Sequence, residues 1–251
     1  MSFYVVIPAR LASTRLPNKP LADIEGKPMI VRVAEQAAKS GARDIIVATD
    51  AQSIVDACTA NHIPAILTRK DHTSGTDRIA EVAANMNWDD DATIVNVQGD
   101  EPLIAPTLIS ATAALISDTT PMSTAAHALE SPEDIFNPNY VKVVLNKNHQ
   151  AMYFSRAAIP WYRDGYAKSE KQYPTFPALR HIGLYAFRND FLKTYTSLTV
   201  APMEQLESLE QLRVLWHGYP IAVYITRQIP EAGVDTLADL ERVRKRYATF
   251  K

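Results

Sequence analysis

The chain has 251 residues, of which 47% are hydrophobic and 22% charged, the composition of an ordinary globular protein with a large core. Its formal net charge of −2 argues against a nucleic-acid-binding domain, because such domains are usually basic. The single cysteine, Cys58, excludes an internal disulfide and favours a reducing compartment, so we expect a cytoplasmic protein.

The first half of the chain alternates apolar strands with helices. Short apolar runs predict strands at Phe3–Ile7, Asp44–Thr49, Ala65–Thr68 and Thr93–Val97. Helical spacing of apolar residues predicts helices at Met29–Lys39, Ser53–Asn61, Thr76–Met86 and Pro106–Ile116. Apolar strands separated by helices indicate an α/β fold whose mainly parallel sheet is covered by helices on both faces.

This alternation ends after Thr120. Strands are predicted at Met122–Leu129, Val141–Leu145 and Gly183–Phe187, with an irregular Tyr- and Pro-rich stretch, Ile159–Leu179, between the last two. Helices are predicted at Asp190–Thr196, Glu207–His217 and Thr236–Arg246, and a strand at Ile221–Thr226. No stretch is long enough to span a bilayer. We therefore predict one domain over residues 1–251, with a mixed sheet and an antiparallel insertion or dimerisation region around residues 120–180.

A cationic loop, Ile7–Leu21, follows the first strand directly. It carries Arg10, Arg15 and Lys19 within ten residues of the strand end. Ligands of open α/β sheets bind outside the carboxyl ends of the strands, and arginine and lysine suit phosphate oxygens. A solvated basic loop is the alternative, but the position favours phosphate binding. The Walker A and Gly-x-Gly-x-x-Gly patterns are absent, which argues against an ATPase of that type and a dinucleotide oxidoreductase.

Two carboxylates stand at positions suited to a magnesium ion. Asp100 follows the strand Thr93–Val97, and Asp235 follows the strand Ile221–Thr226 after a short connection. Mg²⁺ prefers oxygen ligands and usually takes one or two protein carboxylates. Gly99-Asp100 is also a common turn pair, and Asp235 could simply cap the following helix, so the spacing leaves both alternatives open.

Three further segments carry weaker signals. The polar loop Thr73–Arg78 opens a helix, where a cation such as Arg78 opposes the helix dipole and suggests an anionic partner. In Arg180–Tyr185, His181 and Tyr185 share one face of a strand, although a structural histidine is the commoner case. In Glu204–Arg213, the side chains of Glu210 and Gln211 could face either a polyhydroxylated substrate or water.

Taken together, these segments resemble the 3-deoxy-manno-octulosonate (Kdo) cytidylyltransferases, also called CMP-Kdo synthetases. The motifs that carry the resemblance are Ile7–Leu21, Thr73–Arg78, Asn96–Pro102, Arg180–Tyr185, Glu204–Arg213 and Gly233–Thr236, in the family's order and over nearly the whole chain. One departure is visible: the family usually has Gly before the loop lysine, where this chain has Asn18. Asparagine tolerates left-handed backbone better than most other residues.

The resemblance implies a Rossmann-like nucleotidyltransferase fold and transfer of CMP from CTP to the anomeric hydroxyl of Kdo, with release of pyrophosphate, for lipopolysaccharide synthesis. It also implies a cytoplasmic homodimer that uses Mg²⁺ and binds neither nucleic acid nor membrane. The roles carried over are CTP binding by Ala9, Arg10, Arg15, Lys19 and Thr73, metal binding by Asp100 and Asp235, and Kdo binding by Arg78, Gln98, His181, Tyr185, Glu210 and Gln211. The implied catalytic set is Arg10, Lys19, Asp100 and Asp235.

Two other functions remain open from the residues alone. The chain could be a nucleotidyltransferase for another acidic sugar, such as sialic acid, or for a sugar phosphate. It could also be a non-catalytic nucleotide-binding regulator, but such a protein would be expected to lose Asp100 or Asp235, and both are present.

Overall fold

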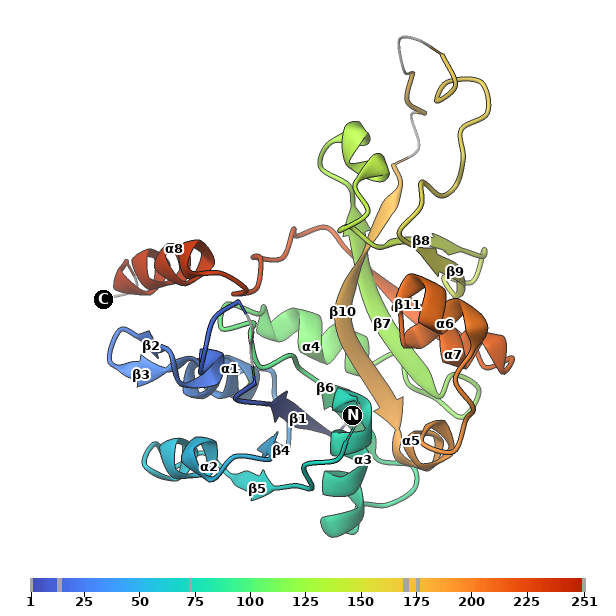
Figure 1. Ribbon diagram of the computed structural model, residues 1–251. Coiled ribbons are helices and arrows are strands. Elements are labelled where there is room, and N and C mark those ends of the chain that lie inside the picture. The colour runs from blue at the N-terminus through green and yellow to red at the C-terminus, as the bar shows by residue number, and fades with distance from the viewer. Residues whose placement is uncertain (1, 13–14, 73, 169–171, 175–176, 250–251) are drawn as a thin grey trace. The chain divides into compact units, whose positions relative to one another are not determined.

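The computed structural model of the chain, shown in Figure 1, describes residues 2–12, 15–72, 74–168, 172–174 and 177–249. The chain divides into two compact units. Unit 1 comprises Met1–Ala114, Leu184–Thr196 and Pro230–Lys251, and unit 2 comprises Leu115–Gly183 and Ser197–Ile229. The predicted insertion around residues 120–180 belongs to unit 2, whereas the description of residues 1–251 as one domain stays a prediction.

Unit 1 is built on parallel strands. β6 (Thr93–Asn96), β1 (Phe3–Ala9), β4 (Asp44–Thr49) and β5 (Ala65–Leu67) lie in that order, each parallel to its neighbour. The end of β10 (Leu179–Arg188) pairs with β6 in the antiparallel direction, with Tyr185 opposite Asn96. Most side chains of β1 and all of those of β6 are buried, as expected for strands covered on both faces.

Two groups of helices cover this sheet. α1 (Met29–Ala38) packs against β4, α2 (Gln52–Thr59) and α4 (Pro106–Ala113). α3 (Gly75–Asn85) packs against β1, β4 and α5 (Asn189–Tyr195). Figure 1 shows α1 and α2 on one side of the strands and α3 on the other, which confirms the predicted mixed, mainly parallel sheet with helices on both faces.

The strand order places two loops side by side. From β1 the chain proceeds to β4 and β5 on one side, and then returns to β6 on the other side of β1. The loops that follow β1 and β6 therefore leave neighbouring carboxyl ends of the sheet, at the point where ligands of such folds bind. These are the loops that carry Lys19 and Asp100.

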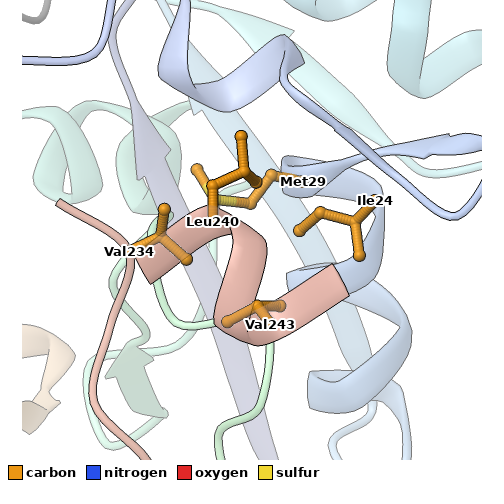
Figure 2. Close-up of a cluster of buried hydrophobic side chains, with 5 residues drawn as sticks. All are labelled: Ile24, Met29, Val234, Leu240 and Val243. Carbon is orange, nitrogen blue, oxygen red and sulfur yellow. The ribbon is translucent and has the colours of Figure 1, made fainter. Parts of the chain in front are cut away.

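A hydrophobic cluster supports the same end of unit 1. Ile24 of the β2–β3 hairpin (Asp23–Ile24 and Lys27–Pro28), Met29 of α1, Val234, and Leu240 and Val243 of α8 (Leu237–Ala248) are almost fully buried against one another, as Figure 2 shows. Leu16, in the cationic loop, packs against this cluster. Because Val234 belongs to it, the cluster fixes the chain next to Asp235.

Unit 2 contains the remaining strands. β11 (Ile221–Thr226) runs parallel to β7 (Met122–Ala128), which neighbours β10. β8 (Lys142–Leu145) pairs in the antiparallel direction with the start of β10 and with β9 (Ala151–Ser155), which the sequence analysis did not predict. A short 3-10 helix, η2 (Pro132–Phe136), follows β7.

The helix predicted at Glu207–His217 is present but begins later than predicted. Two helices occupy the region, α6 (Pro202–Glu207) and α7 (Gln211–Trp216). Ser208 adopts a left-handed conformation with φ 51°, which ends α6 before α7 begins. None of the described helices combines the length and the apolar character that a membrane crossing requires.

Candidate active site

The cationic loop after β1 is shaped by Asn18 and Pro20. Asn18 has φ 54° and ψ 30°, the left-handed conformation that asparagine tolerates. A short 3-10 helix, η1 (Lys19–Leu21), begins directly after it, with Pro20 in its first turn. The replacement of the family's usual glycine by Asn18 is therefore compatible with the loop, and the loop places Lys19 with its side chain only 16% exposed.

Lys19 joins the two carboxylates that the sequence analysis singled out. Its Nζ lies 2.7 Å from Oδ2 of Asp100 and 3.1 Å from Oδ1 of Asp235, and it donates to the carbonyl oxygen of Val234 at 3.0 Å. Nη2 of Arg15 lies 3.1 Å from the same Oδ1 of Asp235. Residues that are 81 and 216 positions from Lys19 in the chain thus meet at one ammonium group.

The backbone of the two acidic loops is also joined. The N–H of Val234 donates to the carbonyl oxygen of Asp100 at 2.9 Å. A Cβ at Gly99 would lie 2.8 Å from the carbonyl oxygen of Pro8, so this loop can cross the end of β1 only with glycine there. The backbone positions of the two acidic loops are therefore held by contacts that do not involve Lys19.

The alternative that Asp235 caps the last helix is wrong. Thr236 is the N-cap of α8, and its Oγ1 accepts a hydrogen bond from the N–H of Asp239. The carboxylate of Asp239 accepts in return from the N–H of Thr236, which completes a capping box. The carboxylate of Asp235 is thus left to pair with Lys19 and Arg15.

The electrostatics of this cluster follow from burial and charge. Burial acts to lower the pKa of Lys19, but the charges and hydrogen bonds of Asp100 and Asp235 outweigh it, so the pKa is raised and the ammonium stays charged. Burial raises the pKa of Glu101 to about 7, and the negative charge of Asp100 acts in the same direction. A second carboxyl group beside Asp100 therefore titrates near neutrality.

Other predicted residues of unit 1 lie around the same strand ends. Ala9 is the buried last residue of β1, and Gln98 is half-buried in the loop after β6. Nη2 of Arg10 donates to the carbonyl oxygen of His72 at 3.0 Å, so Arg10 does not join Lys19 at the carboxylates. Tyr185 is buried on β10 opposite Asn96. Thr73 lies outside the described residues.

Arg78 is buried and pairs with an internal carboxylate. Its side chain is fully buried, and its Nη2 lies 2.9 Å from Oδ2 of Asp50. Nη1 donates to Oγ1 of Thr68 and to the carbonyl oxygen of Arg69. The anionic partner of this cation in the structure is Asp50, an internal carboxylate, and the contact of Arg78 with Kdo stays a prediction.

The three remaining Kdo-pocket candidates belong to unit 2. Nε2 of His181 lies 2.9 Å from Oγ1 of Thr124, and its ring packs edge-on against Phe154. Burial lowers the pKa of His181 to about 3, so the imidazole is neutral at physiological pH. These contacts match the structural alternative. Glu210 is the half-buried N-cap of α7, and Gln211 is the buried first residue of that helix.

Comparison with known proteins identifies the family. Residues 4–227 match the family described as cytidylyltransferase. A protein from Herminiimonas arsenicoxydans named 3-deoxy-manno-octulosonate cytidylyltransferase is 65% identical over 248 residues, which cover 98% of this chain and 99% of the relative. The chain belongs to the 3-deoxy-manno-octulosonate cytidylyltransferase family.

Solved structures agree with this membership. A CMP:2-keto-3-deoxy-manno-octonic acid synthetase complexed with CTP matches with a TM-score of 0.90 and 40% identity, covering 100% of this chain and 99% of that chain. A cytidylyltransferase from Leptospira borgpetersenii serovar Hardjo-bovis (strain JB197) matches with a TM-score of 0.63 at 14% identity, covering 100% of this chain and 87% of that chain. The second match shows a shared fold only.

Sequence reasoning missed a buried polar network near the motif that contains Glu210. Oε1 of Glu207 accepts from Oγ of Ser155 at 2.6 Å, and Oε2 accepts from the N–H of Arg156 at 2.9 Å. The buried ammonium of Lys142 donates to the carbonyl oxygens of Asn137, Tyr140 and Arg156. In this member of the Kdo cytidylyltransferase family, the network fixes the end of α6. Its partners lie about fifty residues away from Glu207, so no local signal marked it.

Proposed function

We propose that this chain transfers the cytidylyl group of CTP to Kdo and releases pyrophosphate. The observation that carries the proposal is the pair of carboxylates, Asp100 and Asp235, held at the carboxyl end of the sheet beside Lys19 and Arg15. The anomeric oxygen of Kdo forms the new bond to the α-phosphorus and gives up its proton to water, and the bond between that phosphorus and the oxygen bridging to the β-phosphate breaks, so that pyrophosphate leaves. Membership in the Kdo cytidylyltransferase family supports this choice of substrates.

The donor set suits a magnesium ion. Two carboxylates and the carbonyl oxygen of Val234 surround one cationic group, Nζ of Lys19, so the position already accepts a positive charge among oxygen atoms. Oxygen donors with only two carboxylates are what Mg²⁺ takes beside nucleotide phosphates. We propose that Asp100 and Asp235 hold Mg²⁺, which supplies charge neutralisation on the phosphates and polarises the attacking hydroxyl.

The other roles follow from charge. Kdo is an anionic sugar acid and CTP is a polyanion, so the protein must offset their repulsion and hold them in line. We assign Arg10, Arg15 and Lys19 to the phosphates, with Ala9 at the nucleotide pocket. For Kdo we keep the predicted contacts as proposals: Arg78, Gln98, His181, Tyr185, Glu210 and Gln211. His181 enters that role as a neutral hydrogen-bonding group, because its pKa of about 3 excludes a cation at neutral pH.

We further propose a homodimer formed through unit 2. Most of the large apolar side chains that are exposed among the described residues belong to this unit: Met152, Trp161, Val200, Leu206, Trp216, Tyr224, Ile225 and Ile229. Such concentrations of exposed apolar side chains mark interaction surfaces. A cytoplasmic location and a role in lipopolysaccharide synthesis are proposed from the family resemblance, and the buried thiol of Cys58 is consistent with a reducing compartment.

The deciding experiment measures pyrophosphate release with Mg²⁺. CTP, UTP and ATP are each combined with Kdo and with sialic acid, and a sugar phosphate is included as a third acceptor. We expect release only with CTP and Kdo, and only when Mg²⁺ is present. Release with another pair would replace the substrate assignment, and no release with any pair would favour the non-catalytic nucleotide-binding alternative.

A further inference from the structure

Lys19 occupies a position that a divalent cation would take. Its ammonium group is within hydrogen-bonding distance of Oδ2 of Asp100, Oδ1 of Asp235 and the carbonyl oxygen of Val234. An ammonium offers three donors, and these three oxygens match that number. The contacts therefore match all three donors of Lys19 and neutralise part of the charge of both acids.

The backbone that carries the two carboxylates is held in place by contacts that do not involve Lys19. The backbone of Asp100 is tied to Val234 by a hydrogen bond of 2.9 Å, and Val234 is buried in the hydrophobic cluster of Figure 2. Gly99 is pressed against the carbonyl oxygen of Pro8. A cation that reached both carboxylates would thus meet the ammonium of Lys19 at the same place. Two positive charges a few ångströms apart repel strongly in a partly buried site.

The side chain of Lys19, by contrast, could bind other oxygen atoms when a nucleotide is present. It lies in a short 3-10 helix of the loop after β1, next to a cation, Arg15, whose side chain is 65% exposed. A triphosphate arriving at this loop would offer oxygens with more negative charge than the two carboxylates share. Lysine is a flexible point charge and can exchange one set of oxygen partners for another without a change in the backbone.

We propose that Lys19 is an internal placeholder for the metal: in the nucleotide-free protein it excludes a divalent cation from Asp100 and Asp235, and it gives up this position only when the phosphates of CTP draw it away. The inference rests on the proposed metal role of the two carboxylates. It implies that nucleotide and metal bind together, so that the enzyme does not collect divalent cations when CTP is absent.

The test uses Mn²⁺ as the probe and follows its free signal by electron paramagnetic resonance, with the full-length protein and no nucleotide. Wild type is expected to bind Mn²⁺ weakly, and Lys19→Met is expected to bind it about tenfold more tightly or better, because the competing charge is gone. Lys19→Gln serves as a second substitution, and the melting temperature of each variant checks that it is folded. Adding Asp100→Asn to Lys19→Met is expected to abolish the gain.

Two control variants, each of which removes one positive charge, test whether the effect of Lys19 comes from its position between the carboxylates or only from its charge. Arg15→Met removes a cation that contacts Asp235 but does not lie between the two acids. Lys27→Met removes a lysine of the same unit that pairs with Glu35. Both are expected to change the Mn²⁺ affinity by less than about threefold, since the position between the carboxylates stays filled.

The outcomes are distinguishable. If both folded Lys19 variants bind Mn²⁺ no better than wild type, or if Arg15→Met gains as much as Lys19→Met, the placeholder role is overturned. A parallel titration adds CTP and compares wild type with Asp100→Asn. If wild type then binds no Mn²⁺ beyond the amount seen with Asp100→Asn, the proposed metal role of Asp100 fails and the inference falls with it. If wild type does bind more, a failure of the Lys19 variants concerns the inference alone.

Discussion

The carbonyl oxygen of Asp100 accepts a hydrogen bond of 2.9 Å from the N–H of Val234, which joins the loop after β6 to the segment that precedes α8. This bond brings Asp100 next to Asp235 although the two residues are far apart in the chain. The loop after β6 reaches this position by crossing the end of β1, where a side chain at Gly99 would collide with backbone. The relative position of the two proposed metal ligands therefore depends on Gly99.

Gly99→Ala should damage the site more than the fold. The added Cβ would lie 2.8 Å from the carbonyl oxygen of Pro8, so the loop must shift and carry Asp100 with it. A displacement of about 1 Å can cost about a hundredfold in rate. Gly75→Ala is the matched control, because its Cβ would meet Cγ of the same proline at an ordinary 3.5 Å. We expect kcat to fall only in Gly99→Ala; equal activities of the two variants would contradict the argument.

Asp100→Asn should abolish turnover and leave the protein folded. The backbone bond to Val234 does not involve the side chain, so the loop stays in place while one of the two proposed metal ligands loses its charge. We expect kcat to fall by about a hundredfold or more, as for other groups that stabilise developing charge. Asp56→Asn, which makes the same change at an exposed carboxylate on α2, serves as the control. Near-normal Mg²⁺-dependent activity in Asp100→Asn would remove Asp100 from the metal role.

Glu207 should act as a positioning residue for Glu210 and Gln211. Its carboxylate accepts from Ser155 and Arg156, and Nε of Arg156 donates to its carbonyl oxygen at 2.7 Å, so the turn that leads into α7 is fixed from three directions. Glu207→Ala leaves buried donors without an acceptor, which typically costs about 1–3 kcal/mol. If Glu210 and Gln211 bind Kdo, the KM for Kdo should rise about tenfold while the KM for CTP changes by less than about twofold.

The decisive result is whether the KM for Kdo rises while the KM for CTP stays nearly unchanged. Glu207→Gln keeps the size of the side chain and one acceptor oxygen, so it should restore most of the affinity for Kdo. Gln205→Ala, at an exposed position of α6, should behave as wild type. Equal increases in both KM values, or a loss of thermal stability with neither KM changed, would assign Glu207 a structural role only.

The sequence was most informative where local patterns are sufficient. The longer strands and helices of unit 1 were predicted with small errors at their ends, because apolar runs and helical spacing need no knowledge of distant contacts. Asn18 is another case, since its intrinsic tolerance of the left-handed region was expected and its φ is 54°. The sequence could also have shown that Asp235 does not cap α8. Thr236 and Asp239 have the spacing of a capping box, which leaves Asp235 outside the helix. The β2–β3 hairpin and η1 were not predicted.

What could not be predicted depends on distant partners. Arg78 pairs with Asp50, which is 28 residues away, and nothing near Arg78 indicates that its charge is satisfied internally. The break between α6 and α7 falls at Ser208, a residue with no strong tendency to left-handed backbone, and is supported by contacts of Glu207 with β9. The position of Lys19 between two carboxylates required the strand order, because the three residues come from three separate loops.

The proposed dimer gives a prediction about exposed apolar residues of unit 2. Leu206 on α6 and Met152 on β9 are 86% and 64% exposed. Replacing either residue by aspartate should destabilise the dimer, because burying a charge without a partner is costly. Leu67→Asp changes a leucine of unit 1 that is 52% exposed and should leave the dimer intact. Light scattering after size exclusion gives the mass. The proposed dimer surface would be rejected if the wild type is a monomer. It would also be rejected if Leu206→Asp and Met152→Asp both remain dimers.

His181 predicts how stability changes with pH. Burial lowers its pKa from 6.5 to about 3 in the folded protein, so between these values the unfolded chain binds a proton that the folded protein does not. The contribution of His181 to the free energy of unfolding is therefore fully present above pH 6.5 and is lost as the pH falls toward 3. Because each pH unit corresponds to at most about 1.4 kcal/mol per proton and the ring is half-buried, we expect a loss of about 1 kcal/mol between pH 7.5 and 5.5.

Urea unfolding at the two pH values provides the measurement, and a substitution isolates the contribution of His181 from that of other titrating groups. His181→Gln keeps a neutral hydrogen-bonding side chain beside Thr124 but cannot be protonated in the unfolded chain. The difference in unfolding free energy between pH 7.5 and 5.5 should therefore shrink by about 1 kcal/mol in this variant. His62→Asn, at an exposed position with φ 58°, is the control, since asparagine suits that backbone. If His181→Gln and wild type lose the same stability on acidification, the imidazole is not held neutral by the fold.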